Sequence, residues 1–283
     1  MFSKDKHHRF ARPSIELVTW LLAVMMFCGV ANPSFAQGAT SAPKPGTDDA
    51  PVVALLSLIG DRLHVVRKLP STGTNLEPIK RDAIAIDTPM FDQQAMNASI
   101  RGLRRAMSKA EFAVLNARSP VLFDRQSSLF ERSGQTIKMP EAIVDAARQQ
   151  GANRILLILK RREEANFSFV TGNVESAPRL EGLGFFLDAS MDVYAMNAQG
   201  ERVASGRGFV APYVFVDLLL VDVATGRILG ERGITAARTI ASGTADGDPA
   251  TSWNAMSSAD RARIITQLLN DNIERRAEQL VPR

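Results

Sequence analysis

The sequence is very poor in cysteine. Its 283 residues contain a single one, Cys28, and that residue lies in a segment interpreted below as an export leader. The mature chain would therefore have no cysteine, which excludes internal disulfides, thiol nucleophiles and cysteine-ligated zinc or iron–sulfur centres. Its stability must come from an ordinary hydrophobic core.

Histidine is almost as scarce. His7 and His8 fall in the same leader, so His64 is the only histidine of the mature chain. One histidine cannot form a metal cluster, and the sequence predicts no metal site. His64 could act as a general base with Asp61 or Asp82. A strand histidine that faces solvent or bonds a neighbour explains it more simply.

Sequence motifs for nucleophiles and phosphate binding are missing. A serine hydrolase places its serine in Gly-x-Ser-x-Gly, and neither 204–206 nor 241–243 supplies that pattern. The glycines between 182 and 208 form no Gly-x-Gly-x-x-Gly loop between a strand and a helix. We therefore predict no catalytic residue and no cofactor.

The first 36 residues have the order of a cleavable signal peptide. Four basic residues precede an apolar run from Leu17 to Ala31, and Ser34-Phe35-Ala36 supplies the small-x-small pattern before Gln37. This apolar run is shorter than the roughly 20 residues that a membrane-spanning helix needs, so a permanent anchor is disfavoured. Acylation of Cys28 is also disfavoured, because bulky residues precede it. We predict a periplasmic protein that meets the membrane only through its leader.

The rest of the chain is close to electrically neutral. Without the leader it has 30 basic and 28 acidic residues, a net charge of +2. That balance argues against non-specific binding of nucleic acid. Residues 37–50 are rich in Pro, Gly, Ser and Thr and predict a flexible linker, and 51–283 predict a single domain.

The first half of this domain alternates strands and helices. The apolar run from Val52 to Ile59, which resumes at Leu63, predicts a buried strand followed by a bend or a hairpin. Helices are expected near 89–109, with Thr88 as the cap, and near 140–150, with Gly151 as a left-handed stop. Further strands are expected at 84–86, 112–115 and 155–159.

The second half predicts an antiparallel meander from Leu183 to Ile240, with strands near Leu183, Val203, Val214 and Ile228. A capping box at 257–260 opens a long carboxy-terminal helix that extends to about 281. Residues 166–180 are expected to form a hairpin packed on the core, although a mobile insertion is the alternative. The fold class is α/β, with one mixed sheet and helices packed on it.

Acidic pairs are the remaining candidates for chemistry. Asp87 with Asp92, Asp188 with Asp192, and Asp217 with Asp222 could in principle act as acid and base. Their spacing does not favour this role. Asp217 and Asp222 are five residues apart, which sends them to opposite faces of a regular strand, and Asp222 suits a turn.

A basic stripe lies on the helix predicted at 89–109. Its members are Arg101, Arg104, Arg105 and Lys109, and a solvated helix face is the simplest interpretation. The sharper hypothesis is a docking strip for an anionic partner, such as an acidic protein, a membrane surface or a glycan polymer, because clustered charges concentrate the field.

Two stretches resemble a group of known envelope domains. Glu141 to Ile158 reads as a helix, Gly-Ala and a buried strand, and Tyr213 to Gly230 reads as a strand, an Asp-x-x-Thr-Gly hairpin and a strand. Both stretches resemble the domains of the curli-secretion lipoprotein and the lipoprotein activators of penicillin-binding proteins. The amino-terminal domain of the Tol-system propeller protein has a similar layout. The resemblance implies a non-enzymatic accessory module that contacts other envelope proteins or assembles with itself.

The sequence thus supports one main hypothesis and two rivals. The main hypothesis is a periplasmic accessory or interaction module whose partner is another envelope protein or a second copy of itself. The first rival is an envelope hydrolase with a carboxylate pair from distant loops, which predicts a cleft with two carboxylates and a raised pKa. The second rival is a small-ligand-binding protein, which predicts an apolar pocket with a few polar groups.

Overall fold

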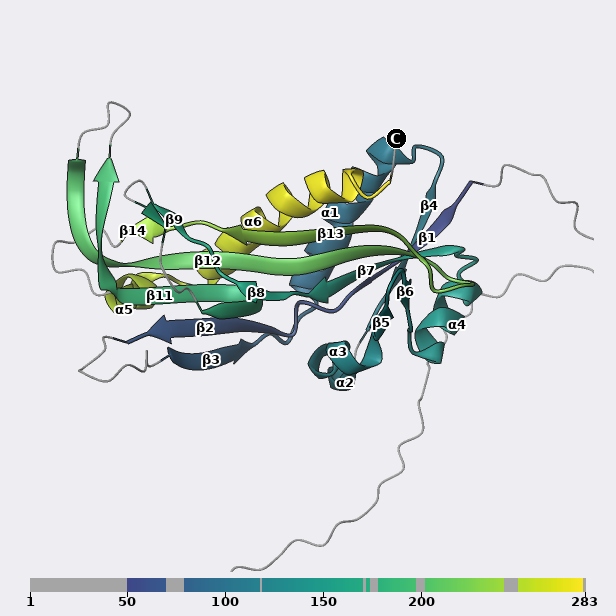
Figure 1. Cartoon of the computed structure of the whole chain (residues 1–283), viewed down its shortest axis with the longest axis horizontal. Helices are drawn as coiled ribbons and strands as arrows, with labels where there is room; N and C mark the ends of the chain where they lie inside the picture. The colour runs from purple at the N-terminus through teal and green to yellow at the C-terminus, as the bar shows by residue number, and fades with distance from the viewer. Residues whose placement is uncertain are drawn as a thin grey trace, which may run out of the picture. The chain divides into compact units, whose positions relative to one another are not determined.

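The longest strand, β12 (Arg202–Asp222), runs through the middle of the main sheet (Figure 1). The computed structural model describes residues 50–69, 79–117, 119–169, 172–173, 178–196, 202–241 and 249–281. All of these belong to one of the two units into which the chain divides, Asp48–Arg283. The predicted leader, and the predicted linker up to residue 49, lie outside the described residues.

The described residues form one large sheet, two small hairpins and several helices. The strands of the large sheet besides β12 are β1 (Val52–Ser57), β2 (Arg62–Lys68), β3 (Ile79–Ala85), β4 (Glu111–Leu115), β7 (Arg154–Lys160), β8 (Arg162–Glu164), β11 (Arg179–Met196), β13 (Ile228–Ala237) and β14 (Ile240–Ala241). The hairpins are β5 (Arg132–Ser133) with β6 (Thr136–Ile137), and β9 (Ser168–Phe169) with β10 (Gly172–Asn173). The helices are α1 (Met90–Ala106), α2 (Pro120–Asp124), α3 (Gln126–Leu129), α4 (Glu141–Gln149), α5 (Pro249–Ala255) and α6 (Ser258–Glu278).

Strand β12 holds two different groups of strands along one edge. β7 pairs with Val216 to Asp222, whereas β11 pairs with the part of β12 up to Phe215. β1 and β4 continue the sheet beyond β7, and β2 and β3 continue it beyond β11. β13 and β14 pair with the opposite edge. The sheet therefore divides at residues 58–61 and 160–161, and we call this place the fork.

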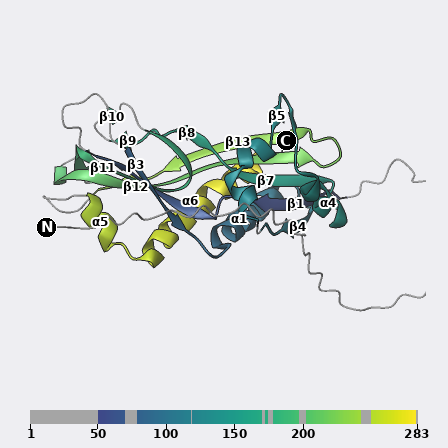
Figure 2. The same cartoon turned by 90° about the horizontal axis from the view of Figure 1, so that it is seen from below.

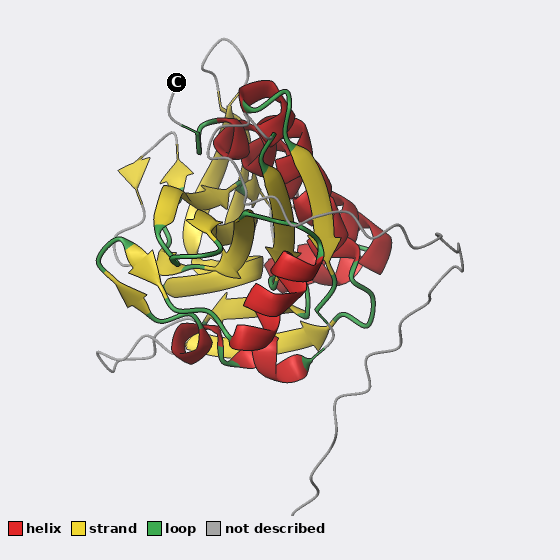
Figure 3. Cartoon of the chain, turned by 90° about the vertical axis from the view of Figure 1, so that its right-hand side faces the viewer, coloured by secondary structure: helices red, strands yellow, loops and turns green. Residues whose placement is uncertain are grey.

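The side chains of β1 pack on both faces of the sheet, and the two connections that follow β1 lie on opposite faces. Val53 and Leu55 pack on the face that carries α1, and Ala54 and Leu56 pack on the face that carries α4. β4 and β7 flank β1 in parallel, so the connection from β1 to β4 uses one face and the connection from β4 to β7 uses the other. Helices accordingly cover both faces (Figure 3).

The face that carries α1 is completed by α5 and α6, which follow one another along the sheet (Figure 2). At the β11 end of the opposite face, Ala165 and Phe167, which follow β8, cover the sheet. There Phe167 stacks on Phe186 at 5.0 Å between ring centroids and meets Phe209 edge-on at 5.6 Å. With β9 and β10 paired in the same segment, the hairpin predicted for 166–180 is confirmed for its described residues.

Several sequence predictions are confirmed in detail. The meander is formed by β11, β12, β13 and β14, and the long carboxy-terminal helix is α6. Ser257 caps α6, because its hydroxyl accepts a hydrogen bond from the Asp260 amide at 3.0 Å. Gly151 follows α4 with a φ of 70°, which is the left-handed stop that was expected.

Other details of the prediction are wrong. The strands expected near Val203 and Val214 are one strand, because β12 continues through Gly208, where φ is 81°, and through Pro212. Pro212 lies where the partner of β12 changes from β13 to β14, so a missing amide can be tolerated there. β1 and β2 do not pair, which excludes the hairpin and leaves the bend. Helix α1 has no side-chain cap, so Thr88 does not perform that role.

Helices α1 and α6 approach each other closely at Gly102. A Cβ at this position would lie 2.2 Å from the Glu274 carbonyl oxygen and 3.0 Å from the Ala277 Cβ. Only a residue without a side chain allows the two backbones to come this near. The contact joins two helices from opposite ends of the domain sequence.

Replacing Gly102 with Ala is expected to destabilise the fold by about 1–3 kcal/mol, since overpacking of a close contact outweighs the gain in helix propensity. Asn97→Ala, on an exposed position of the same helix, is the matched control and should be neutral or slightly stabilising. Chemical denaturation of both variants measures the difference. Equal midpoints for Gly102→Ala and the wild type would contradict the close contact.

Candidate functional site

The fork leaves backbone groups of β1 and β7 without sheet partners. The last bond between the strands runs from the Leu58 amide to the Ile158 carbonyl at 3.0 Å. Beyond it the buried side chain of Gln126 fills the gap: its Nε2 donates to the Leu58 carbonyl at 2.5 Å, and its Oε1 accepts from the Lys160 amide at 2.9 Å. The amide side chain of Gln126 thus takes the place of direct backbone hydrogen bonding between the two strands.

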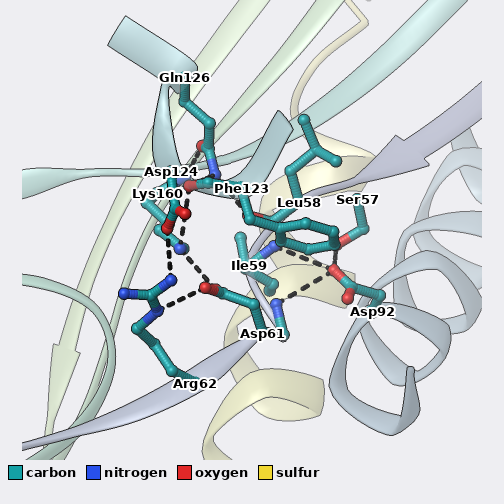
Figure 4. A network of polar contacts seen from close by, with 11 residues as sticks. Ser57, Leu58, Ile59, Asp61, Arg62, Asp92, Phe123, Asp124, Gln126 and Lys160 are labelled. Atoms are coloured by element: carbon teal, nitrogen blue, oxygen red, sulfur yellow. Dashed lines mark hydrogen bonds and ion pairs between the residues drawn. The ribbon is translucent and has the colours of Figure 1, made fainter. Parts of the chain in front are cut away.

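Asp92, in the first turn of α1, performs the same task on the other side of β1. Its Oδ1 accepts hydrogen bonds from the Ser57 hydroxyl at 2.6 Å, the Ile59 amide at 2.9 Å and the Gly60 amide at 3.2 Å (Figure 4). The residue is only 6% exposed. Burial raises the pKa of the Asp92 carboxyl, and the three hydrogen bonds oppose that shift without cancelling it.

An ionic cluster closes the fork. The Lys160 ammonium lies 2.5 Å from Asp61 and is 7% exposed, and it also donates to the Phe123 carbonyl at 3.2 Å. Arg62 binds Asp61 through Nε and Asp124 through its terminal nitrogen. Two cations therefore face two carboxylates, and Figure 4 shows the four side chains converging beside Gln126. The cluster is neutral as a whole.

A cavity of about 670 Å³ lies beside this network, at the carboxyl ends of β1 and β4. Its wall combines residues 60–62 after β1, the end of β3 with the chain that follows it, and Ala117, Pro120 and Phe123 after β4. In α/β sheets, ligands bind outside the carboxyl ends of the strands. This cavity lies at the carboxyl ends of β1 and β4, so we take it as the candidate site and call it the cleft. The cleft is lined by Gly60, Asp61, Arg62, Ala83, Ala85, Ile86, Asp87, Thr88, Pro89, Asp92, Ala117, Pro120 and Phe123.

The fold places the acidic pairs noted in the sequence in different surroundings. Asp87 and Asp92 both line the cleft. Asp222 forms the predicted turn, because its Oδ1 accepts from the Thr225 amide and hydroxyl. Asp217 binds Arg161 at 2.9 Å, and burial raises the pKa of its carboxyl. Only the first pair therefore stands in a cavity with a third carboxylate.

Asp188 is fully buried in β11, and its Oδ1 accepts hydrogen bonds from the Ser190 amide and hydroxyl. The side chain of its predicted partner, residue 192, lies outside the described residues. This pair is therefore not assigned to a site.

His64 is half-buried on β2, opposite Gly184 of β11 and Ala83 of β3. Burial, with the nearby Lys160 ammonium, lowers the pKa of its imidazole, so the ring is neutral at pH 7. Within the described residues it makes no hydrogen bond to Asp61 or Asp82, its suggested partners. The simpler interpretation, a strand histidine, fits this position better.

The basic stripe lies at the junction of α1 and α6. Arg101 binds Glu274 at 2.7 Å and Arg105 binds both Glu274 and Glu278, so these two cations are used inside the chain. Exposed Arg104 lies over the ring of Phe112, with 5.7 Å from its guanidinium carbon to the ring centroid, and exposed Lys109 follows the end of α1. As a partner surface the stripe stays a prediction.

Two further properties concern the described part of the chain alone. It contains no group of three or more His, Cys, Asp or Glu side chains arranged to hold a metal ion. None of its helices combines the length and apolar character needed to span a bilayer.

Sequence reasoning missed Gln126 and Lys160, the two residues that hold the fork together. Neither belongs to a motif, and each lies more than 30 residues from the strand end with which it interacts. A partial signal was present: Ser57 interrupts an otherwise apolar run, and Gly60-Asp61 ends it. Polar residues at the carboxyl end of a buried strand are the usual sign of a crevice.

Comparison with known proteins finds likeness only among solved structures. No family model and no curated protein matches the chain. The Xanthomonas campestris protein XCC0632, described as a DUF330 protein, is 12% identical over 81% of this chain and 82% of its own, with a TM-score of 0.34. PelC from Paraburkholderia phytofirmans, solved as a dodecamer, is 13% identical over 83% and 93%, with a TM-score of 0.27.

A putative neuraminyllactose-binding hemagglutinin homologue from Helicobacter pylori is 10% identical over 84% of this chain and 97% of its own, with a TM-score of 0.26. None of these three structures is described as a curli-secretion, penicillin-binding-protein-activator or Tol-system protein. The resemblance to those domains therefore stays a prediction.

Replacing Gln126 with Leu is expected to cost about 2–3 kcal/mol of folding free energy, since the Leu58 carbonyl and the Lys160 amide would lose their partner. Ser127→Ala, at the exposed neighbouring position, is the control and should change stability little. Urea unfolding followed by circular dichroism measures both variants. A Gln126→Leu protein as stable as its control would show that the amide does not bridge the fork.

The raised pKa of Asp92 has a definite sign for stability. Because the folded state holds the proton more tightly than the unfolded state, the contribution is fully present below about pH 4 and is lost as pH rises through the raised pKa. Asp92→Asn keeps an acceptor for the two amides and does not titrate. The unfolding free energy of the wild type, relative to this variant, is expected to fall as the pH rises above about 4. A difference that does not change with pH would contradict the assignment.

Proposed function

We propose that the protein is an exported, non-enzymatic accessory module of the bacterial envelope, and that it acts by binding at the cleft. Export is supported by the order of basic, apolar and small residues in 1–36. Binding is supported by the position of the cleft at the carboxyl ends of β1 and β4. The partner is another envelope protein, a second copy of the chain, or a smaller molecule that the module senses or carries.

The observation that carries the proposal is the balance of the ionic cluster. A general acid or base must exchange its proton with a substrate, and a nucleophile must be activated by a neighbouring base. Asp61 is instead held by Lys160 and Arg62, and Oδ1 of Asp92 by three donors. Of the described residues that line the cleft, Thr88 alone carries a hydroxyl. Such an arrangement holds a shape and suits binding better than turnover.

The envelope hydrolase is a second candidate, favoured by one specific observation. Asp61, Asp87 and Asp92 line the same cleft, and the pKa of Asp92 is raised by burial. Both features belong to clefts that perform acid–base chemistry. The candidate ranks second because two of the three carboxylates are already engaged, and because the described wall of the cleft contains no histidine, lysine or serine to complete a catalytic set.

The proposal includes the basic stripe as a second contact surface, limited to two of its four residues. Arg101 and Arg105 hold α6 through Glu274, so an anionic partner would find Arg104 and Lys109 exposed beside them. Substitution of Arg104 and Lys109 tests whether the stripe binds a partner, and it leaves the ion pairs between α1 and α6 in place.

Export is tested by expressing the full sequence in a Gram-negative bacterium. The protein is expected in the periplasmic fraction with Gln37 as its first residue, as determined by amino-terminal sequencing. Ala36→Tyr should leave the precursor uncut, because the peptidase accepts only small residues at that position. Ala39→Tyr, beyond the cut, is the control and should be processed normally. A cytosolic protein that begins at Met1 would overturn the proposal.

A further inference from the structure

Counted over the described residues, the cleft carries more negative charge than the neighbouring cations neutralise. Asp61 and Asp124 are balanced by Lys160 and Arg62. Asp87 and Asp92 also line the cleft, and neither forms an ion pair with a cation among the described residues. Two carboxylates of its wall are therefore without a cationic partner in the part of the chain that the structure describes.

Asp92 is the more informative of the two, because it is buried and only half satisfied. All three of its hydrogen bonds reach Oδ1, and all three donors are neutral groups. Oδ2 accepts no hydrogen bond from the described residues, and Figure 4 shows it outside the dashed contacts. Asp92 as a residue is 6% exposed, and its Oδ2 is not one of the fully buried oxygens, so this oxygen can be reached from the cleft. The free oxygen stands in the wall of an open cavity.

The remainder of the wall is mostly apolar. Ala83, Ala85 and Ile86 come from β3 and the chain after it, and Ala117 and Phe123 come from the chain after β4. These side chains offer dispersion contacts and no hydrogen bonds. The cleft thus joins an acidic end, at Asp87 and Asp92, to an apolar body, and its volume of about 670 Å³ lies in the usual range for small-molecule sites.

We propose that the cleft binds a small organic cation, in which an ammonium group meets Asp92 Oδ2 and Asp87 while an apolar portion lies between Ala85 and Phe123. The ammonium supplies a positive charge and hydrogen-bond donors to Oδ2, which has neither among the described residues. An anionic ligand would add a third uncompensated negative charge and is disfavoured by Coulomb repulsion. The inference rests on the proposal that the protein acts by binding at the cleft.

A metal cation fits the cleft less well than an organic one. Divalent cations of the hard type take six or more oxygen ligands, and no three acidic or histidine side chains of the described residues are arranged for that purpose. The apolar wall would also be left without a contact. An ammonium with a hydrocarbon body uses both parts of the cleft.

The test compares two probes of equal chain length and opposite charge, n-octylammonium and n-octanoate, each titrated into the purified protein at pH 7. Binding is followed by the backbone amide shifts of Gly60, Thr88 and Ala117 in ¹⁵N-labelled protein, which also locate the probe. Octylammonium is expected to saturate and to bind at least tenfold more tightly than octanoate. Equal affinity for the two probes, or shifts that do not saturate, would overturn the proposal.

Variants separate the acidic end from the apolar body. The double variant Asp87→Asn, Asp92→Asn is expected to weaken octylammonium at least tenfold, whereas Asp145→Asn, on α4, is the control and should bind as the wild type does. Ala85→Lys places a cation on an exposed wall position, where folding is little affected, and should reverse the preference in favour of octanoate.

An unchanged probe preference in both cleft variants would also overturn the inference. Export and processing are measured on separate samples by fractionation and sequencing. A failure of probe binding would therefore be distinguishable from a failure of the proposed envelope location.

Discussion

The fold depends on the way in which β1 leaves the sheet. A strand that departs from its neighbour exposes amides and carbonyls that must find new partners in the protein interior. Gln126 supplies them for Leu58 and Lys160, and Asp92 supplies them for Ile59 and Gly60. These two side chains come from helices on opposite faces, so the departure is fixed from both sides. The cleft exists because the strands stay apart at this point.

The same constraint explains the distribution of charge around the fork. Lys160 and Asp61 are both largely buried, and a buried ion pair is tolerable only where hydrogen bonds satisfy the groups around it. The Phe123 carbonyl and the Arg62 guanidinium do so, and Asp124 then balances Arg62. The cluster is thus neutral as a whole and closes the fork. The surplus charge is confined to Asp87 and Asp92, on the side that opens into the cleft.

Local patterns predicted the fold class because burial is periodic along the chain. The alternation in the meander, the apolar stripe of α6, the Ser257 cap and the Gly151 stop are properties of neighbouring residues, and all of them are confirmed. The continuity of β12 was missed because Gly208 and Pro212 usually end a strand. Here an irregularity in the pairing with β11, between Arg207 and Phe209, accommodates Gly208, and a change of partner strand accommodates Pro212.

The site was less accessible to sequence reasoning, for a physical reason. Its residues come from the ends of β1 and β7, from α1 and from the chain after β4, and no local spacing connects them. Asp87 and Asp92 were noted as a pair, but their unpaired charge becomes visible only when every nearby cation is assigned a partner. The basic stripe shows the opposite error. Its charges looked unpaired in the sequence, but Arg101 and Arg105 form ion pairs with Glu274, which lies far along the chain.

The meeting of α1 and α6 at Gly102 has a consequence for the order in which the molecule can assemble. Helix α1 lies near the start of the domain and α6 at its end, so the apolar surface around Phe91 and Leu103 stays uncovered until the final segment has been delivered. Closure of this part of the core therefore waits for the last helix, and a fragment that ends before α6 would keep an uncovered apolar surface that chaperones and proteases can recognise.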